Sequence, residues 1–159
     1  MTDWKLPWQA QCLCGQVQMT ISEPPMASFA CHCRDCQKLT GGAYSLTLML
    51  PAHGFKAEGE TEIGGLHRDR LRHHFCTHCK NWLYTDGFAE GLVNFRPTLL
   101  DDADWIVPFA ETFTCEKLPA AHTGATMSFD RFPDESDFPA IMEGFTNSGI
   151  HPNCCLLYT

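Results

Sequence analysis

Three short clusters of cysteine constrain the fold of this chain more than any other feature of its sequence. Seven of the ten cysteines form a pair at positions 12 and 14, a trio at positions 31, 33 and 36, and a pair at positions 76 and 79. Thiolates bind tetrahedral zinc, and two of them reach one ion either from an extended segment at i and i+2 or around a tight turn at i and i+3. All three clusters have one of these spacings, so the sequence predicts zinc binding.

The number of clustered cysteines limits how zinc can be held. Seven thiolates cannot complete two sites of four ligands, but they can complete one closed site and one three-ligand site with a vacant position. The trio lies within six residues and is expected to share one ion: Cys31, Cys33 and Cys36. A structural site is then left to four cysteines: Cys12, Cys14, Cys76 and Cys79. The spacing favours this partition, with two zinc ions per chain, and leaves open one structural zinc with several buried free thiols.

The three remaining cysteines lack such spacing. Cys115 is isolated and is expected to be a free thiol. Cys154 and Cys155 are adjacent, and adjacent cysteines chelate poorly, so no metal role is predicted for them.

Composition favours one domain over residues 1–159, because 44% of the residues are apolar and can form one core. The N-terminal residues lack the basic and apolar segments of a secretory signal, and no run approaches the roughly 18 apolar residues of a membrane span. The chain is therefore expected in the cytoplasm, where clustered cysteines bind metal rather than form disulfides. A net charge of −8 argues against nucleic acid as a partner.

The residues around the cysteines resemble the glutathione-dependent formaldehyde-activating enzyme family. The resemblance rests on CLCGQV at 12–17, CHCRDCQKLTG at 31–41 and HFCTHC at 74–79, and it runs from about residue 10 to about residue 115. It implies a β-tent fold of antiparallel sheets over two zinc sites, with the partition given above. It also implies a carbon–sulfur lyase of the S-(hydroxymethyl)glutathione synthase type. Lys80 departs from the family, which commonly has glycine there, and the tail over residues 117–159 matches no known motif.

Alternating and β-rich segments predict a mainly β chain. Two pairs of segments are expected to form hairpins, 54–62 with 70–75 and 82–85 with 91–95. Further strands are expected over residues 11–21, 28–33, 43–50 and 110–115. One helical turn is expected over residues 100–105 and a short helix over residues 137–145.

An open three-cysteine zinc indicates chemistry on a thiol, because metal coordination makes the thiolate the stable form of an incoming thiol. The trio is therefore expected to bind a small thiol such as glutathione, or its adduct with formaldehyde or another aldehyde, and to make or break a carbon–sulfur bond. The main alternative is a zinc-stabilised binding module without turnover. A nucleic-acid-binding zinc ribbon suits the paired cysteines but not the charge. A homodimer is compatible with exposed strand edges.

Other residues have weaker signals. Arg34, Lys38 and the basic run 67–74 could anchor an acidic substrate, or could be a solvated charged face. His32 lies between two predicted ligands and is expected to point away from them in an extended segment. Four aromatic residues are expected in the core rather than in a substrate site: Trp82, Phe88, Trp105 and Phe109.

Overall fold

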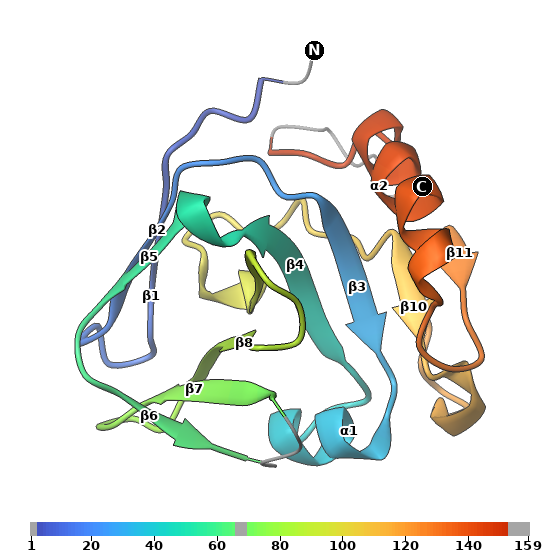
Figure 1. Ribbon diagram of the computed structural model, residues 1–159. Coiled ribbons are helices and arrows are strands. Elements are labelled where there is room, and N and C mark those ends of the chain that lie inside the picture. The colour runs from blue at the N-terminus through green and yellow to red at the C-terminus, as the bar shows by residue number, and fades with distance from the viewer. Residues whose placement is uncertain (1–2, 66–69, 153–159) are drawn as a thin grey trace.

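The computed structural model describes residues 3–65 and 70–152, and β-strands dominate them (Figure 1). The strands are β1 (Trp8–Gln11), β2 (Gln18–Ile21), β3 (Ala27–Cys31), β4 (Ser45–Pro51), β5 (Phe55–Glu58), β6 (Thr61–Gly64), β7 (Arg72–Cys76), β8 (Trp82–Asp86), β9 (Leu92–Phe95), β10 (Ala110–Thr112) and β11 (Met127–Ser128). The helices are α1 (Arg34–Thr40) and α2 (Phe138–Asn147), with short 3₁₀ turns η1 (Ala52–Gly54), η2 (Pro97–Leu99), η3 (Thr114–Glu116) and η4 (Glu135–Asp137). The predicted mainly β fold is confirmed.

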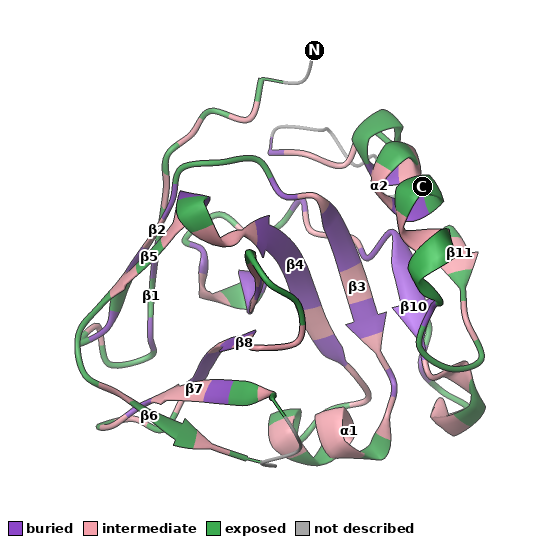
Figure 2. Ribbon diagram, in the orientation of Figure 1, coloured by how far each residue is buried: buried purple, intermediate pink, exposed green. Residues whose placement is uncertain are grey.

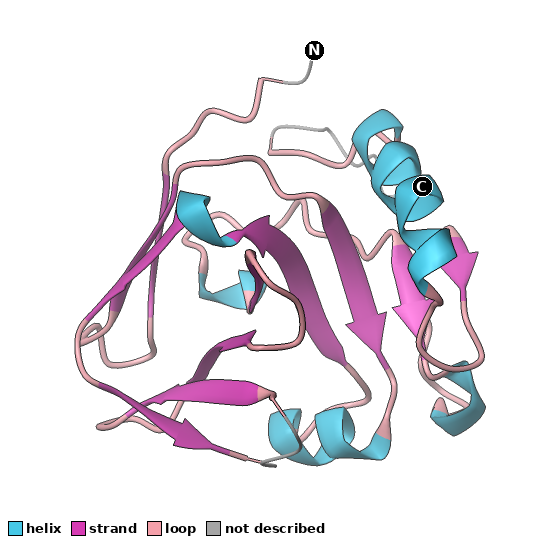
Figure 3. Cartoon of the chain, in the orientation of Figure 1, coloured by secondary structure: helices cyan, strands magenta, loops and turns pink. Residues whose placement is uncertain are grey.

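The described strands form two sheets that lean together over a common interior (Figures 1 and 3). The small sheet has the order β1-β2-β5, and the large one has the order β11-β10-β3-β4-β9-β8-β7-β6. The pairings are antiparallel except at one edge, where β10 runs parallel to both β3 and β11. This parallel edge places residues 110–112 beside residues 29–31, at the strand that ends in the cysteine trio.

The core has two parts, one between the sheets and one beneath α2 (Figure 2). Between the sheets, apolar side chains of the small sheet meet those of the large one, among them Met19, Ile21, Leu48, Leu83 and Phe95. Within the described residues, neither α1 nor α2 has the length and hydropathy of a membrane-spanning helix.

Helix α2 confirms the predicted helix over residues 137–145. It follows a capping box, in which the Asp134 backbone N–H donates to the Asp137 carboxylate over 2.9 Å. Ile141 and Phe145, spaced i and i+4, point from one face of α2 into the second part of the core.

Two predicted strands are each interrupted in the structure. The expected strand over residues 11–21 breaks into β1 and β2, because Cys12 begins a turn in which the Gly15 N–H donates to the Cys12 carbonyl over 2.9 Å. Gly15 has a φ of 77°, which favours glycine. The expected strand over residues 54–62 divides at Gly59, so that β5 pairs with β2 and β6 with β7.

Helical positions were less well predicted than strands. The expected helical turn over residues 100–105 is wrong: the turn is η2, which begins at Pro97, and Leu100 instead forms a bridge with Ala10. Proline favours the first position of a helix, which explains the earlier start. Helix α1 was not expected, and β10 ends at Thr112 instead of residue 115 because η3 follows it.

Candidate functional site

Four cysteines from two distant turns meet at the first candidate metal site. The Sγ atoms of Cys12, Cys14, Cys76 and Cys79 all lie within 4.8 Å of one another. Cys12 and Cys14 are 3.4 Å apart, and Cys14 and Cys76 are 3.7 Å apart. A tetrahedron with metal–sulfur bonds of about 2.3 Å has edges of about 3.8 Å. The four sulfurs therefore fit a tetrahedral ion.

Backbone hydrogen bonds shape the two turns around this site. In the first turn the Val17 N–H donates to the Cys12 sulfur over 3.3 Å. In the second the Lys80 N–H donates to the Cys76 carbonyl over 3.0 Å. Asn81 joins the turns, because its side-chain oxygen accepts from the Leu13 N–H over 3.0 Å.

Lys80, which stands where the resembled family commonly has glycine, adopts a left-handed backbone conformation. Its φ is 59°, in a region where a side chain costs free energy that glycine does not. Its Nζ lies 2.7 Å from a carboxylate oxygen of Glu62 on β6. Both side chains are largely exposed, so this ion pair compensates little of the backbone cost.

The other three cysteines meet where β3 passes into α1. Cys31 ends β3, Cys33 is the N-cap of α1, and Cys36 lies in its first turn. Their Sγ atoms lie within 4.8 Å of one another. The Cys36 N–H donates to the Cys33 sulfur over 3.4 Å, so one cysteine also caps the helix.

Hydrogen bonding within the trio favours one thiolate among the three sulfurs. Hydrogen bonds from Cys33 and then Cys36 lower the pKa of Cys31 to about 3. The same contacts with Cys31 raise the pKa of Cys33 and of Cys36. A bound cation would favour the ionised form of every ligand, as metal-binding thiols require.

A buried carboxylate holds the segment that carries the trio. His32 is fully buried, and its Nε2 lies 2.9 Å from Glu111 Oε2 on β10. Three other side chains donate to the same carboxylate: Lys117, Thr123 and Ser128. Burial alone would raise the pKa of Glu111, but the hydrogen bonds, with that of Lys117 the largest, lower it to about 2.

The residues after His32 are tied to the same region. The Gln37 side-chain amide donates to the carbonyls of His32 at 2.6 Å and of Glu116 at 3.0 Å. The Arg34 N–H donates to the Glu116 carboxylate over 2.6 Å. The position of the trio therefore depends on residues about 80 positions further along the chain.

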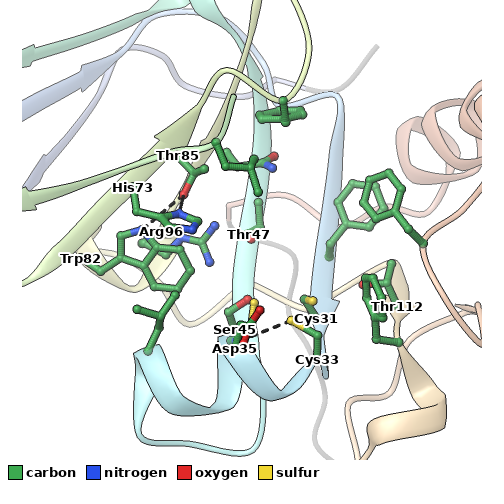
Figure 4. Close-up of a pocket in the computed structure, with 18 of the residues that line it drawn as sticks. Cys31, Cys33, Asp35, Ser45, Thr47, His73, Trp82, Thr85, Arg96 and Thr112 are labelled. Atoms are coloured by element: carbon green, nitrogen blue, oxygen red, sulfur yellow. Dashed lines mark hydrogen bonds between the residues drawn. The ribbon is translucent and has the colours of Figure 1, made fainter. Parts of the chain in front are cut away.

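A cavity of about 620 Å³ opens beside the trio (Figure 4). Its walls are largely apolar, with Phe29, Leu39, Met49, Leu71, Trp82, Phe88, Phe113, Phe132 and Phe138. Its polar lining consists of the trio with Arg34, Asp35, Ser45, Thr47, His73, Thr85, Asn94, Arg96, Thr112 and Glu116. The trio is thus reachable from a space large enough for a small organic ligand.

Some of the other candidate residues line the cavity and others do not. Trp82, Trp105 and Phe109 are buried core residues as expected, and Trp82 also lines the cavity. Phe88 was expected in the core but is half-buried and lines the cavity. Arg34 also lines the cavity, and Lys38 does not. Of the basic run 67–74, residues 67–69 lie outside the described chain.

Of the three unclustered cysteines, the structure describes one, and it belongs to neither candidate metal site. Cys115 is an exposed free thiol on η3. Cys154 and Cys155 lie outside the described residues.

Sequence reasoning missed Arg96, which is buried at the end of β9 and lines the cavity. Its guanidinium carbon lies 4.0 Å from the centre of the Trp82 ring. Burial lowers the pKa of Arg96 to about 10. The signal in the sequence is a charged residue between Phe95 and Pro97, directly after the predicted strand over residues 91–95.

The fold and the site define a class of small β proteins that gather four and three cysteines into two candidate metal sites, one beside a cavity. Residues 7–116 match the model of the family described as glutathione-dependent formaldehyde-activating enzyme, and the chain belongs to this family. Among solved structures it is similar to the crystal structure of a Rhodobacter sphaeroides protein. The two share 12% identity with a TM-score of 0.49, over 58% of this chain and 87% of that one. No curated protein gives a significant match.

Proposed function

We propose that this protein binds zinc at both cysteine sites and uses the trio to bind a small thiol, such as glutathione, or its adduct with formaldehyde or another aldehyde. There it makes or breaks the carbon–sulfur bond, as a carbon–sulfur lyase. The observation that carries the proposal is the division of the sulfurs: four form one group, and the three that remain line a cavity. Three ligands leave a tetrahedral ion with a position for substrate.

The donor sets fit the metal. Thiolate sulfurs in tetrahedral sets favour zinc among the common biological cations. Cys12, Cys14, Cys76 and Cys79 would hold the structural ion, and Cys31, Cys33 and Cys36 the second. When bound, the second ion supplies Lewis-acid charge that favours the thiolate form of an incoming thiol.

The residues of this chain would hold the trio in position and exclude water from the space where the substrate binds. The hydrogen bonds that the Glu111 and Glu116 carboxylates accept fix the segment around the trio. Apolar walls that include Phe29 and Phe113 shield the space beside it. A thiol and an aldehyde held there meet in one orientation, which favours addition. The sulfur bonds to the carbonyl carbon and the thiol proton ends on the carbonyl oxygen, so the reaction needs no oxidant.

The test compares Cys33→Ser with Cys115→Ser, which alters an exposed thiol outside both clusters. Wild-type protein and Cys115→Ser should contain about two zinc ions per chain and form the thiol–aldehyde adduct faster than buffer does. Cys33→Ser should retain about one ion and lose the acceleration. Unchanged turnover in Cys33→Ser would overturn the proposal. Thiol binding at the trio without acceleration would instead establish the alternative, a zinc-stabilised binding module.

A further inference from the structure

The wall of the cavity contains a buried, positively charged side chain in addition to the sulfurs of the trio. Arg96 is 8% exposed, and its side chain lines the cavity together with Cys31 and Cys36. Figure 4 shows Arg96 beside His73 and Trp82 on one side of β4, with Cys31 and Cys33 near Ser45, where β4 begins. The two groups therefore face one space from different elements.

Arg96 has hydrogen-bonding capacity that the described residues leave unused. Its Nε and Nη1 atoms are buried and have no hydrogen-bond partner there. No described carboxylate forms an ion pair with it either: Glu111 is engaged by His32 and Lys117, and the Glu116 carboxylate by the Arg34 N–H. A buried guanidinium without a partner is costly, because desolvation is not offset by an anion.

The surroundings of Arg96 hold it in place. Its guanidinium lies over the Trp82 ring, and the Trp82 indole N–H donates to the Thr85 hydroxyl over 3.2 Å. The same hydroxyl lies 2.8 Å from His73 Nδ1, and the His73 ring meets the Trp82 ring edge-on at 5.1 Å. The charge is thus positioned before any ligand arrives, which lowers the entropy lost on binding.

We propose that Arg96 binds the carboxylate of the substrate within the cavity. Among the thiols of the proposed function, this role favours a small, mostly apolar one with a single carboxylate over glutathione, which has two, because one buried cation lies among apolar walls that include Phe29 and Met49. A carboxylate provides oxygens for the nitrogen donors and cancels the buried charge. The further statement, that the other end of this molecule carries the thiol or carbonyl that reaches the trio, rests on the proposed function.

A different role for Arg96 would be to offset the negative charge of the sulfurs. Attraction to Cys36 and Cys31 does oppose the effect of burial on its pKa. That role predicts loss of metal when Arg96 is replaced, and it predicts no preference for carboxylates. It leaves the vacant hydrogen-bonding positions unexplained.

The experiment uses the zinc-loaded full chain and three probes: 3-mercaptopropionate, its neutral amide, and propionate, which lacks the thiol. Arg96→Met removes the charge, Arg96→Lys keeps it without the planar donors, and Arg131→Met makes the same change at an exposed site outside the cavity lining. Affinities are measured by calorimetry, and zinc content and melting temperature are recorded for each protein.

Wild type and Arg131→Met should bind 3-mercaptopropionate at least about tenfold more tightly than the amide, as expected for a hydrogen-bonded charge pair. Arg96→Met should bind the two equally, with the affinity for the amide unchanged, and Arg96→Lys should lie between. Zinc content should stay constant, and the melting temperature of Arg96→Met should not fall, because the change removes an unpaired buried charge.

Other results separate this inference from the proposed function. Equal affinity of wild type for the thiol acid and its amide overturns the role of Arg96 and leaves thiol binding standing, even if Arg96→Met does not fold. Loss of zinc from Arg96→Met, with no carboxylate preference in wild type, assigns Arg96 to charge balance and also overturns the inference. Arg96-dependent binding of propionate without any contribution from the thiol supports the carboxylate site and overturns the proposed function. Absence of binding by all probes overturns both.

Discussion

His32 and Glu111 are in direct contact, Nε2 to Oε2 at 2.9 Å, although 79 positions separate them in the sequence. His32 lies between two cysteines of the trio, and Glu111 lies on the strand that runs parallel to β3. The contact is buried and therefore links the geometry of the trio to the edge of the large sheet.

Glu111→Gln should lower the free energy of unfolding at pH 7 by about 2 kcal/mol, since hydrogen bonds to a buried charge are lost. The folded-state pKa of Glu111 is lowered to about 2 from an ordinary value of 4.5. The stabilisation is therefore fully present above pH 4.5 and is lost as the pH falls toward 2. Denaturant titrations of both proteins should show their difference shrinking over this interval. A constant difference would contradict the assigned role of the carboxylate.

Lys80→Gly should stabilise the protein by up to about 1 kcal/mol, because glycine adopts the positive φ without the steric cost of a side chain. The matched control is Lys56→Gly, which removes a similar exposed ion pair, to Glu58, from the ordinary strand β5. The control should destabilise, since glycine weakens a strand. Equal effects in the two thermal melts would show that the backbone at Lys80 is not strained.

Cys76→Ser should lower the melting temperature far more than Cys36→Ser. The four-cysteine site joins turns from the two sheets, and structural zinc sites contribute on the order of 10 kcal/mol to folding. The trio lies on one short segment that other hydrogen bonds also hold. Adding a chelator should reduce the melting temperature of wild type to near that of Cys76→Ser. Equal losses in the two variants would mean that both sites support the fold to the same extent.

Phe132→Ala should weaken ligand binding in the cavity about three- to tenfold and leave stability nearly unchanged. The side chain is 60% exposed, lines the cavity and contacts Phe113 and Phe138 at ring-centre distances of 6.5 and 5.9 Å. Leu13→Ala is the control, since Leu13 is 86% exposed on the Cys12–Cys14 turn and is not part of the cavity wall. Calorimetry with 3-mercaptopropionate measures both. An equal loss in the control would argue against a specific contact.

The sequence was most informative where the determining interactions are local. The hairpin of β8 and β9 follows from alternating residues around a turn, and the cysteine pairs follow from spacing alone. Helix α1 was not predicted, because none of its residues is buried and its sequence therefore has no apolar stripe. It is held instead by the Cys33 cap and by Gln37, whose bonds reach Glu116.

Arg96 and Glu111 show why the rest of the site could not be predicted. Glu111 is a single charged residue within a short strand and Arg96 directly follows one, and such a pattern does not reveal the partners of either. Glu111 meets His32 through the parallel pairing of β10 with β3, and Arg96 meets Trp82 through the pairing of neighbouring strands. The first contact is set by sheet topology, which no local spacing encodes, whereas the second crosses the predicted β8–β9 hairpin, whose side toward the cavity the sequence does not reveal.

The separation of Cys14 from Cys76 by 62 positions also bears on how the protein is made. All three cysteines of the trio have left the ribosome once residue 36 has, although the contacts with Glu111 and Glu116 form later, whereas the four-cysteine site lacks two of its cysteines until residue 79. During that interval Cys12 and Cys14 form a dithiol on an unfinished chain, open to oxidation by whatever the surroundings contain. Recombinant synthesis should therefore yield intact protein when the medium is rich in zinc and the host is reducing, and oxidised, misassembled chains when either condition fails.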